Sequence, residues 1–92
     1  MKAQLEKAIE LRKNEKYIES NELLMKLIEI HPEDATLNYQ CAWSFDVLGE
    51  EAKAVPFYER AISLGLPSAD LEGALLGLGS TYRTLGQYEK SK

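Results

Sequence analysis

The chain repeats itself with a period close to 34 residues, and this periodicity constrains its fold more than any other feature. When residues 8–30 are set against residues 42–64, small residues meet small ones and large apolar residues meet large apolar ones. The matched pairs are Ala8 with Ala42, Leu11 with Phe45, Leu24 with Tyr58, and Ile30 with Leu64. A repeat of this length predicts a stack of similar units, each of which buries its apolar face against its neighbours.

A third copy follows the second but is shorter. Residues 78–91 lie over residues 41–54, with three extra residues in the intervening loop, so that Gly86 falls on Gly49. Because this copy stops soon after its second half begins, we expect the chain to be a piece of a longer repeat protein. The predicted organisation is one domain over residues 1–92, with copies at about 1–34, 35–67 and 68–92, the last incomplete.

Each copy has the pattern of two helices. Apolar residues recur every three or four positions, and no segment alternates with a period of two, so we expect an all-α fold without a sheet. Gly49 and Gly86 mark turns between helices, and Asn14 takes part of that role in the first copy. His31 closes the first pair because Pro32 disfavours helix in the residue before it. The expected helices cover residues 2–13, 16–30, 35–48, 51–64 and 69–85, with a sixth beginning near residue 88.

Length and charge exclude several classes of function. The chain has 92 residues, and its 11 Lys and Arg against 15 Asp and Glu give a net charge of −4. A single small domain rules out most large catalytic scaffolds, and the acidic balance argues against a nucleic-acid partner. No apolar run of about 18 residues exists to cross a membrane. The N-terminus is too charged for a signal peptide, so we expect a cytoplasmic protein.

The sequence offers no catalytic or metal-binding set of residues. His31 is the only histidine and Cys41 the only cysteine, so neither a zinc site nor a Cys-His nucleophile with its orienting group can be completed. We expect Cys41 to pack between helices and His31 to be solvated in its turn. Acidic residues near the predicted helix starts are explained by the helix dipole. We therefore expect no enzyme, no cofactor and no metal.

A helix–turn–helix unit that repeats near 34 residues resembles the tetratricopeptide repeat. The second copy matches the family pattern best, at Ala42, Phe45, Gly49, Ala54, Tyr58 and Ala61. The first copy departs from it at Glu15, where the family has Gly, and at Leu27, where the family has Ala. The resemblance implies a right-handed helical-repeat solenoid of antiparallel helix pairs, with about two and a half repeats.

The resemblance also implies a non-catalytic protein–protein interaction module. Members of the family bind a partner segment in the concave groove that the first helix of each pair lines. The groove positions of this chain hold Leu5, Ile9, Arg12, Tyr39, Trp43, Asp46, Leu76, Ser80 and Arg83. Trp43 and Tyr39 are the candidate anchors, because aromatic side chains bury large areas at modest entropic cost. The alternative is that both rings only pack between neighbouring first helices.

One subtype of the family holds the acidic tails of heat-shock chaperones in a clamp of Lys, Asn and Arg side chains. The corresponding positions here hold Leu5, Ile9, Gln40, Gly73 and Gly77. Because the charges are missing, we do not expect this chain to bind chaperone tails.

Self-assembly is the second hypothesis for the function. An incomplete third copy would expose an apolar stripe, and such a stripe is typical of an interface. The stripe predicted to form a homodimer contains Leu71, Leu75, Leu78, Tyr82 and Leu85.

Overall fold

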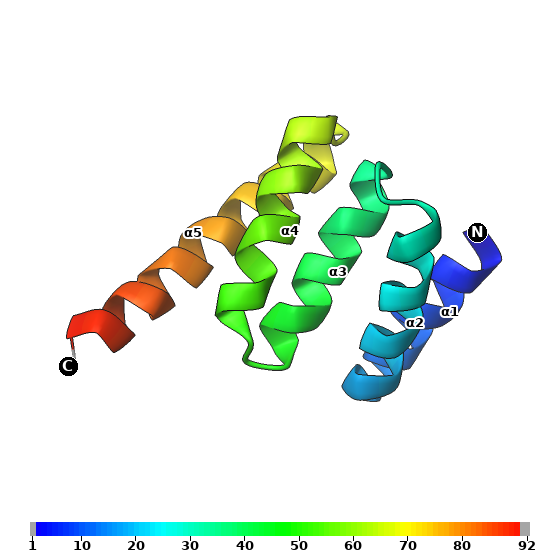
Figure 1. Ribbon diagram of the computed structural model, residues 1–92, viewed down its shortest axis with the longest axis horizontal. Helices are drawn as coiled ribbons and strands as arrows, with labels where there is room; N and C mark the ends of the chain where they lie inside the picture. Colours follow the sequence, from blue (N-terminus) through cyan, green and yellow to red (C-terminus); the bar gives the residue numbers. More distant parts are fainter. Residues whose placement is uncertain (1, 91–92) are drawn as a thin grey trace.

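The computed structural model describes residues 2–90 as helices and short turns, with no strand among them; for residues 82 and 84–90 it describes the backbone alone. Figure 1 shows the helices side by side in chain order, with the two ends of the chain at opposite ends of the long axis. The all-α, helical-repeat fold is therefore confirmed. The helices are α1 (Lys2–Lys13), α2 (Tyr17–Ile30), α3 (Ala35–Val47), α4 (Glu51–Leu64) and α5 (Ser68–Lys90).

The first four helices lie within one residue of their predicted bounds, but the prediction for the fifth was wrong. Instead of ending near residue 85 and giving way to a sixth helix, α5 continues through Gly86 to Lys90. A turn at Gly86 requires a following helix that packs back on α5, and no such helix is present among the described residues. A continuous helix keeps its backbone hydrogen bonds instead. In Figure 1 the C-terminal end of α5 points away from the other helices.

The turn between α1 and α2 repeats, bond for bond, the turn between α3 and α4. The N–H of Lys16 donates to the carbonyl of Leu11, as the N–H of Glu50 donates to that of Phe45, each at 2.9 Å. The residue before each donor is left-handed, with φ of 64° at Glu15 and 78° at Gly49. The residue that takes the glycine's left-handed conformation is therefore Glu15 and not Asn14, so the predicted position was wrong by one residue. Glu15 occupies a backbone conformation that its Cβ makes unfavourable.

Glu15→Gly should therefore raise the free energy of unfolding by about 1 kcal/mol. A residue with a Cβ pays about 1–2 kcal/mol in the left-handed region, and the freer unfolded chain of the glycine variant offsets part of the gain. Urea unfolding measures the change. Lys16→Gly is the matched control, because Lys16 has a φ of −91° and carries no such strain. That control should lose stability, and a gain of the same size in both variants would contradict strain at Glu15.

The core consists of two clusters, one that joins the first helix pair to α3 and one that joins the second pair to α5. The first-pair cluster contains Ala8, Leu24, Leu27, Leu37 and Cys41. The second-pair cluster contains Tyr39, Ala42, Phe45, Ala54, Tyr58, Ala61 and Ala74. Met25 and Phe57 pack against both clusters and join them. The stack is therefore continuous from the first pair into the second.

Small side chains at matching positions of the copies let the two helices of a pair approach closely. Ala8, Ala42 and Ala54 are fully buried, and Ser20 Oγ donates a hydrogen bond of 2.6 Å to the carbonyl of Ala8 across the α1–α2 contact. Serine at this position thus fills the same small space as Ala54 in the second copy and also satisfies its own hydroxyl.

The glycines at 73, 77 and 79 lie at helical spacing, which predicts close helix contacts, and α5 makes such contacts at Gly73 and Gly77 but not at Gly79. A Cβ on Gly77 would lie 2.7 Å from the Tyr58 ring, and a Cβ on Gly73 would overlap the Tyr39 hydroxyl. Gly79 is exposed, and a Cβ there would meet open space. Its predicted contact was with a second helix of the third copy, and no described helix follows α5 to supply one.

Candidate partner-binding face

The ends of α1 and α3 bring Arg12 and Trp43 into direct contact. Arg12 lies in the last turn of α1, and its Cζ stands 3.8 Å from the centroid of the Trp43 ring. Its Nη1 donates a hydrogen bond of 2.6 Å to Oε1 of Gln40, one turn before Trp43 on α3. The guanidinium is thus held from two sides, by the ring under its face and by the amide at its edge.

Arg12 has no counter-ion among the described residues, whose one ion pair joins Lys53 to Glu50 on α4 at 3.2 Å. The guanidinium is half-buried, and this burial lowers the pKa of Arg12 from its ordinary value, while Tyr39 and Tyr58 act in the opposite direction. An arginine remains charged at neutral pH even so. The first-helix face therefore carries a partly desolvated positive charge.

Tyr39 and Trp43 have different environments although they are one turn apart on α3. Their ring centroids lie 5.9 Å apart, but Tyr39 is buried in the second-pair cluster whereas 39% of Trp43 is exposed. Burial raises the pKa of the Tyr39 hydroxyl, and Asp70 adds to the shift while Arg12 opposes it. The Tyr39 ring thus packs within the second-pair cluster. Trp43 keeps an open surface that a partner can cover.

Asp46 is bound within the chain. Its Oδ2 accepts a hydrogen bond of 3.2 Å from the buried Tyr58 hydroxyl. Burial raises the pKa of Tyr58 well above its ordinary value, and the Asp46 carboxylate raises it further by charge and by this bond. Asp46 thus fixes the ring that packs between α3 and α5. This internal bond occupies one of its two carboxylate oxygens.

The remaining predicted groove residues are spread along the face. Leu5 packs partly buried against the first-pair cluster, and Ile9 is half-buried on the same helix. On α5, Leu76 is 74% exposed, and Ser80 and Arg83 are exposed as well. The contacts thus join Arg12 to Trp43 directly, and Leu76, Ser80 and Arg83 follow on α5.

The predicted self-association stripe is open only in part. Leu75 is 52% exposed, but Leu71 and Leu78 are half-buried because α4 packs along α5, and Leu78 contacts the second-pair cluster. The side chains of Tyr82 and Leu85 lie outside the described residues. Among the described side chains of α5, the large apolar ones that are exposed are Leu75 and Leu76, which line a surface hollow of about 450 Å³ with Glu72.

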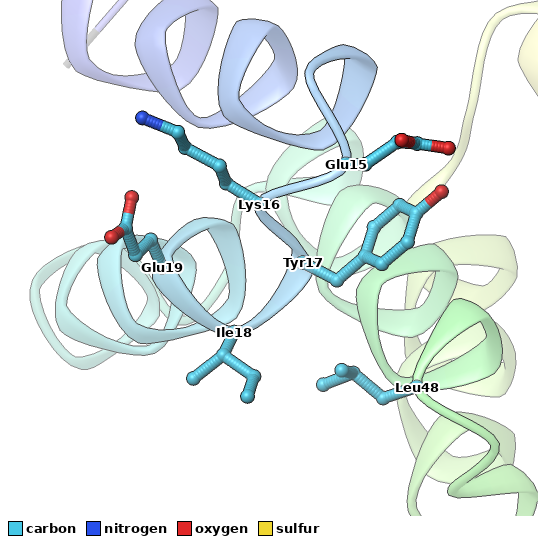
Figure 2. Close-up of a pocket in the computed structure, with 6 residues that line it drawn as sticks. All are labelled: Glu15, Lys16, Tyr17, Ile18, Glu19 and Leu48. Atoms are coloured by element: carbon cyan, nitrogen blue, oxygen red, sulfur yellow. The ribbon is translucent and has the colours of Figure 1, made fainter.

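A second hollow, of about 320 Å³, lies at the edge of the stack, between the start of α2 and the end of α3. Figure 2 shows Ile18 and Leu48 facing each other across it, with Glu15, Lys16 and Glu19 around its rim. Sequence reasoning missed this hollow, because it arises only where the first turn meets the end of a helix from the next copy. No periodic signal marks such a place.

The structure supplies no group poised for catalysis among its described residues. Cys41 is fully buried, its Sγ lies 3.7 Å from the carbonyl oxygen of Leu24, and burial raises the pKa of its thiol to about 12. This thiol stays protonated at neutral pH, and the expectation that Cys41 packs between helices is confirmed. His31 is exposed at the end of α2. Among the described residues, no cluster of three or more His, Cys, Asp or Glu side chains could hold a metal ion.

A family model described as tetratrico peptide repeat matches residues 35–92, which is more than half of the chain. The chain belongs to the tetratricopeptide repeat family. The matched region spans the second and third copies, and the first copy shares the hydrogen bonds of its α1–α2 turn with the α3–α4 turn of the second. No curated protein matches the chain significantly.

Tetratricopeptide repeats generally mediate protein–protein interaction and typically serve as non-catalytic scaffolds. None of the described helices has the length and apolar character needed to cross a membrane.

Proposed function

We propose that this chain binds a segment of a partner protein on the face formed by α1, α3 and α5, with Trp43 as the anchor. This proposal rests on the partial exposure of the Trp43 ring. This ring is the one aromatic side chain of α3 with a large open surface, and Arg12 holds it in place from one side. Interface anchors are characteristically large aromatic rings of this kind.

The preorganisation of Trp43 favours binding energetically. When a partner covers a mobile side chain, the loss of side-chain entropy weakens binding by about 0.5–1.5 kcal/mol for each rotamer-rich group. The contacts with Arg12 and Tyr39 restrict the ring before any partner arrives. Leu76 on α5 offers further exposed apolar area on a first helix. The surface therefore suits an apolar side chain of a partner segment.

Trp43→Ala should weaken binding by about tenfold, or about 1.4 kcal/mol, because the anchor's apolar contact is lost. The probe is a set of short peptides selected from a random displayed library against the immobilised chain, with affinities measured by calorimetry. Leu64→Ala on α4 is the matched control, since Leu64 is 38% exposed and Trp43 is 39% exposed. The control should change affinity less than about twofold. Equal affinities for the Trp43 variant and the intact chain, with the fold unchanged, would place the binding surface elsewhere.

Self-assembly through α5 is the second proposal, and the exposure of Leu75 beside Leu76 favours it. A second copy that covers these leucines would remove exposed apolar area from water. Light scattering over a concentration series measures the mass, and Leu75→Glu should convert a dimer into a monomer. A dimer that survives this change, or a monomer at every concentration, counts against the α5 interface.

A further inference from the structure

Arg12 keeps hydrogen-bond donors that no described residue uses. One donor on Nη1 is bonded to Gln40, and the flat face of the guanidinium is stacked on Trp43. A guanidinium carries its N–H groups in its own plane, so stacking covers the face and leaves the edges free. The remaining N–H groups of Arg12 form no hydrogen bond with the described residues. They present a planar fork to an acceptor from outside the chain.

The charge of Arg12 is unmatched as well. Asp46 accepts a hydrogen bond from Tyr58, and Asp70 lies close enough to Tyr39 for its charge to raise the pKa of that hydroxyl. Neither carboxylate forms an ion pair with Arg12. A cation that has lost part of its water and has no counter-ion interacts strongly with an incoming carboxylate. A bidentate carboxylate also fits the geometry of the free fork.

We propose that Arg12 binds an Asp or Glu side-chain carboxylate of the partner segment, while an apolar side chain of the same segment packs on the open surface of Trp43. The inference rests on the proposed function and adds a specificity to it. The ring under the guanidinium makes the two contacts neighbours, because Arg12 and Trp43 touch each other. The ligand class is therefore a peptide in which an acidic residue lies close to an aromatic or aliphatic one.

The test uses the peptides selected above, displayed without a free C-terminus so that only side chains supply carboxylates. Trp43 is the chain's single tryptophan, so its fluorescence reports binding at this pair directly. We expect acidic residues to be enriched near an apolar position. Replacing that Asp or Glu by its amide should weaken binding about tenfold, as loss of a charge-assisted bidentate contact does.

Three variants locate the effect. On Arg12→Gln, the acidic peptide and its amide should bind within about twofold of each other, because the receptor of the carboxylate is gone. Arg12→Lys keeps the positive charge but loses the planar pair of N–H donors. It should therefore keep only part of the preference for the acidic peptide over its amide. Lys13→Gln removes an adjacent, exposed positive charge and should leave the tenfold discrimination intact. If Arg12→Gln does not fold, the comparison of Arg12→Lys, Lys13→Gln and the intact chain still decides.

The outcomes separate this inference from the proposed function. The selected peptides could depend on Trp43 but show no enrichment of acidic residues. Alternatively, the affinity ratio of acidic peptide to amide could be the same on Arg12→Gln and on the intact chain. Either result overturns the role of Arg12 but leaves the proposed binding face standing. A parallel library with free C-termini is selected as a comparison, and if it alone yields Trp43-dependent peptides, the side-chain assignment is overturned. Absence of any Trp43-dependent peptide overturns both proposals.

Discussion

Leu24→Ala should lower the free energy of unfolding by about 2–5 kcal/mol, which is a large part of the stability of a domain of this size. Leu24 has no exposed surface and lies in the first-pair cluster with Leu27 and Leu37. Truncation removes apolar contacts and leaves a cavity that the surrounding helices fill only in part. Its backbone carbonyl also faces the Cys41 thiol, which is held by the same packing.

Ile18→Ala is the matched control for this prediction. Ile18 is an apolar residue of the same helix, but 66% of its surface is exposed. Its truncation should therefore change the free energy of unfolding by less than about 0.5 kcal/mol. Urea unfolding followed by far-UV circular dichroism measures both variants. Losses of equal size in the two variants would contradict the assignment of Leu24 to the core.

Local sequence signals were sufficient for most of the fold. The bounds of α1 to α4 follow from apolar spacing and from turn residues, and both act over a few positions. Asp34 illustrates this, because its carboxylate caps α3 by accepting from the N–H of Leu37 at 2.8 Å. The turn at Glu15 was located by the period and not by the residue, since glutamate does not favour a left-handed backbone.

The errors concern features that depend on what packs against a residue. Gly86 has the sequence of a turn, yet α5 continues through it, and no described helix follows α5 to pack back on it. Gly79 aligns with buried small residues but meets open space, for the same reason. A periodic sequence predicts which face a residue occupies, and the neighbouring helix decides whether that face is covered.

The candidate site shows the same division. The family resemblance indicated Arg12, Tyr39 and Trp43 together, but it could not distinguish the buried ring from the open one. Tyr39 is covered because α5 presents Gly73 against its hydroxyl, whereas Trp43 meets the guanidinium of Arg12 and keeps part of its surface. The role of Gln40 in holding Arg12 was missed, since a glutamine in a helix carries no signal for a partner in another copy.

Gly77→Ala and Gly79→Ala should change stability in opposite directions, although both replace a glycine within α5. Alanine gains about 1 kcal/mol over glycine from helix propensity alone, so Gly79→Ala should raise the free energy of unfolding by up to about that amount. A Cβ at Gly77 would lie only 2.7 Å from Cζ and Oη of Tyr58. Tyr58 is buried and bonded to Asp46, so its ring cannot yield without cost.

Overpacking of this kind costs about 1–3 kcal/mol, and breaking the hydrogen bond to Asp46 adds about 1 kcal/mol. These costs exceed the gain in propensity, so Gly77→Ala should lower the free energy of unfolding by about 1–3 kcal/mol. Urea unfolding compares the two variants. Stabilisation of both by the same amount would mean that α5 does not pack closely on Tyr58.

A second substitution at Tyr58 assigns the cost to the ring. In a Tyr58→Leu background, the shorter side chain leaves room for a Cβ at Gly77, so Gly77→Ala should become neutral or stabilising there, like Gly79→Ala. The difference between the two backgrounds is the coupling energy of the pair, expected at about 2 kcal/mol. Additive effects, with no such coupling, would place the cost of Gly77→Ala elsewhere in α5. Because Tyr58 also bonds to Asp46 on the first-helix face, this coupling would tie the packing of the third copy to the proposed binding surface.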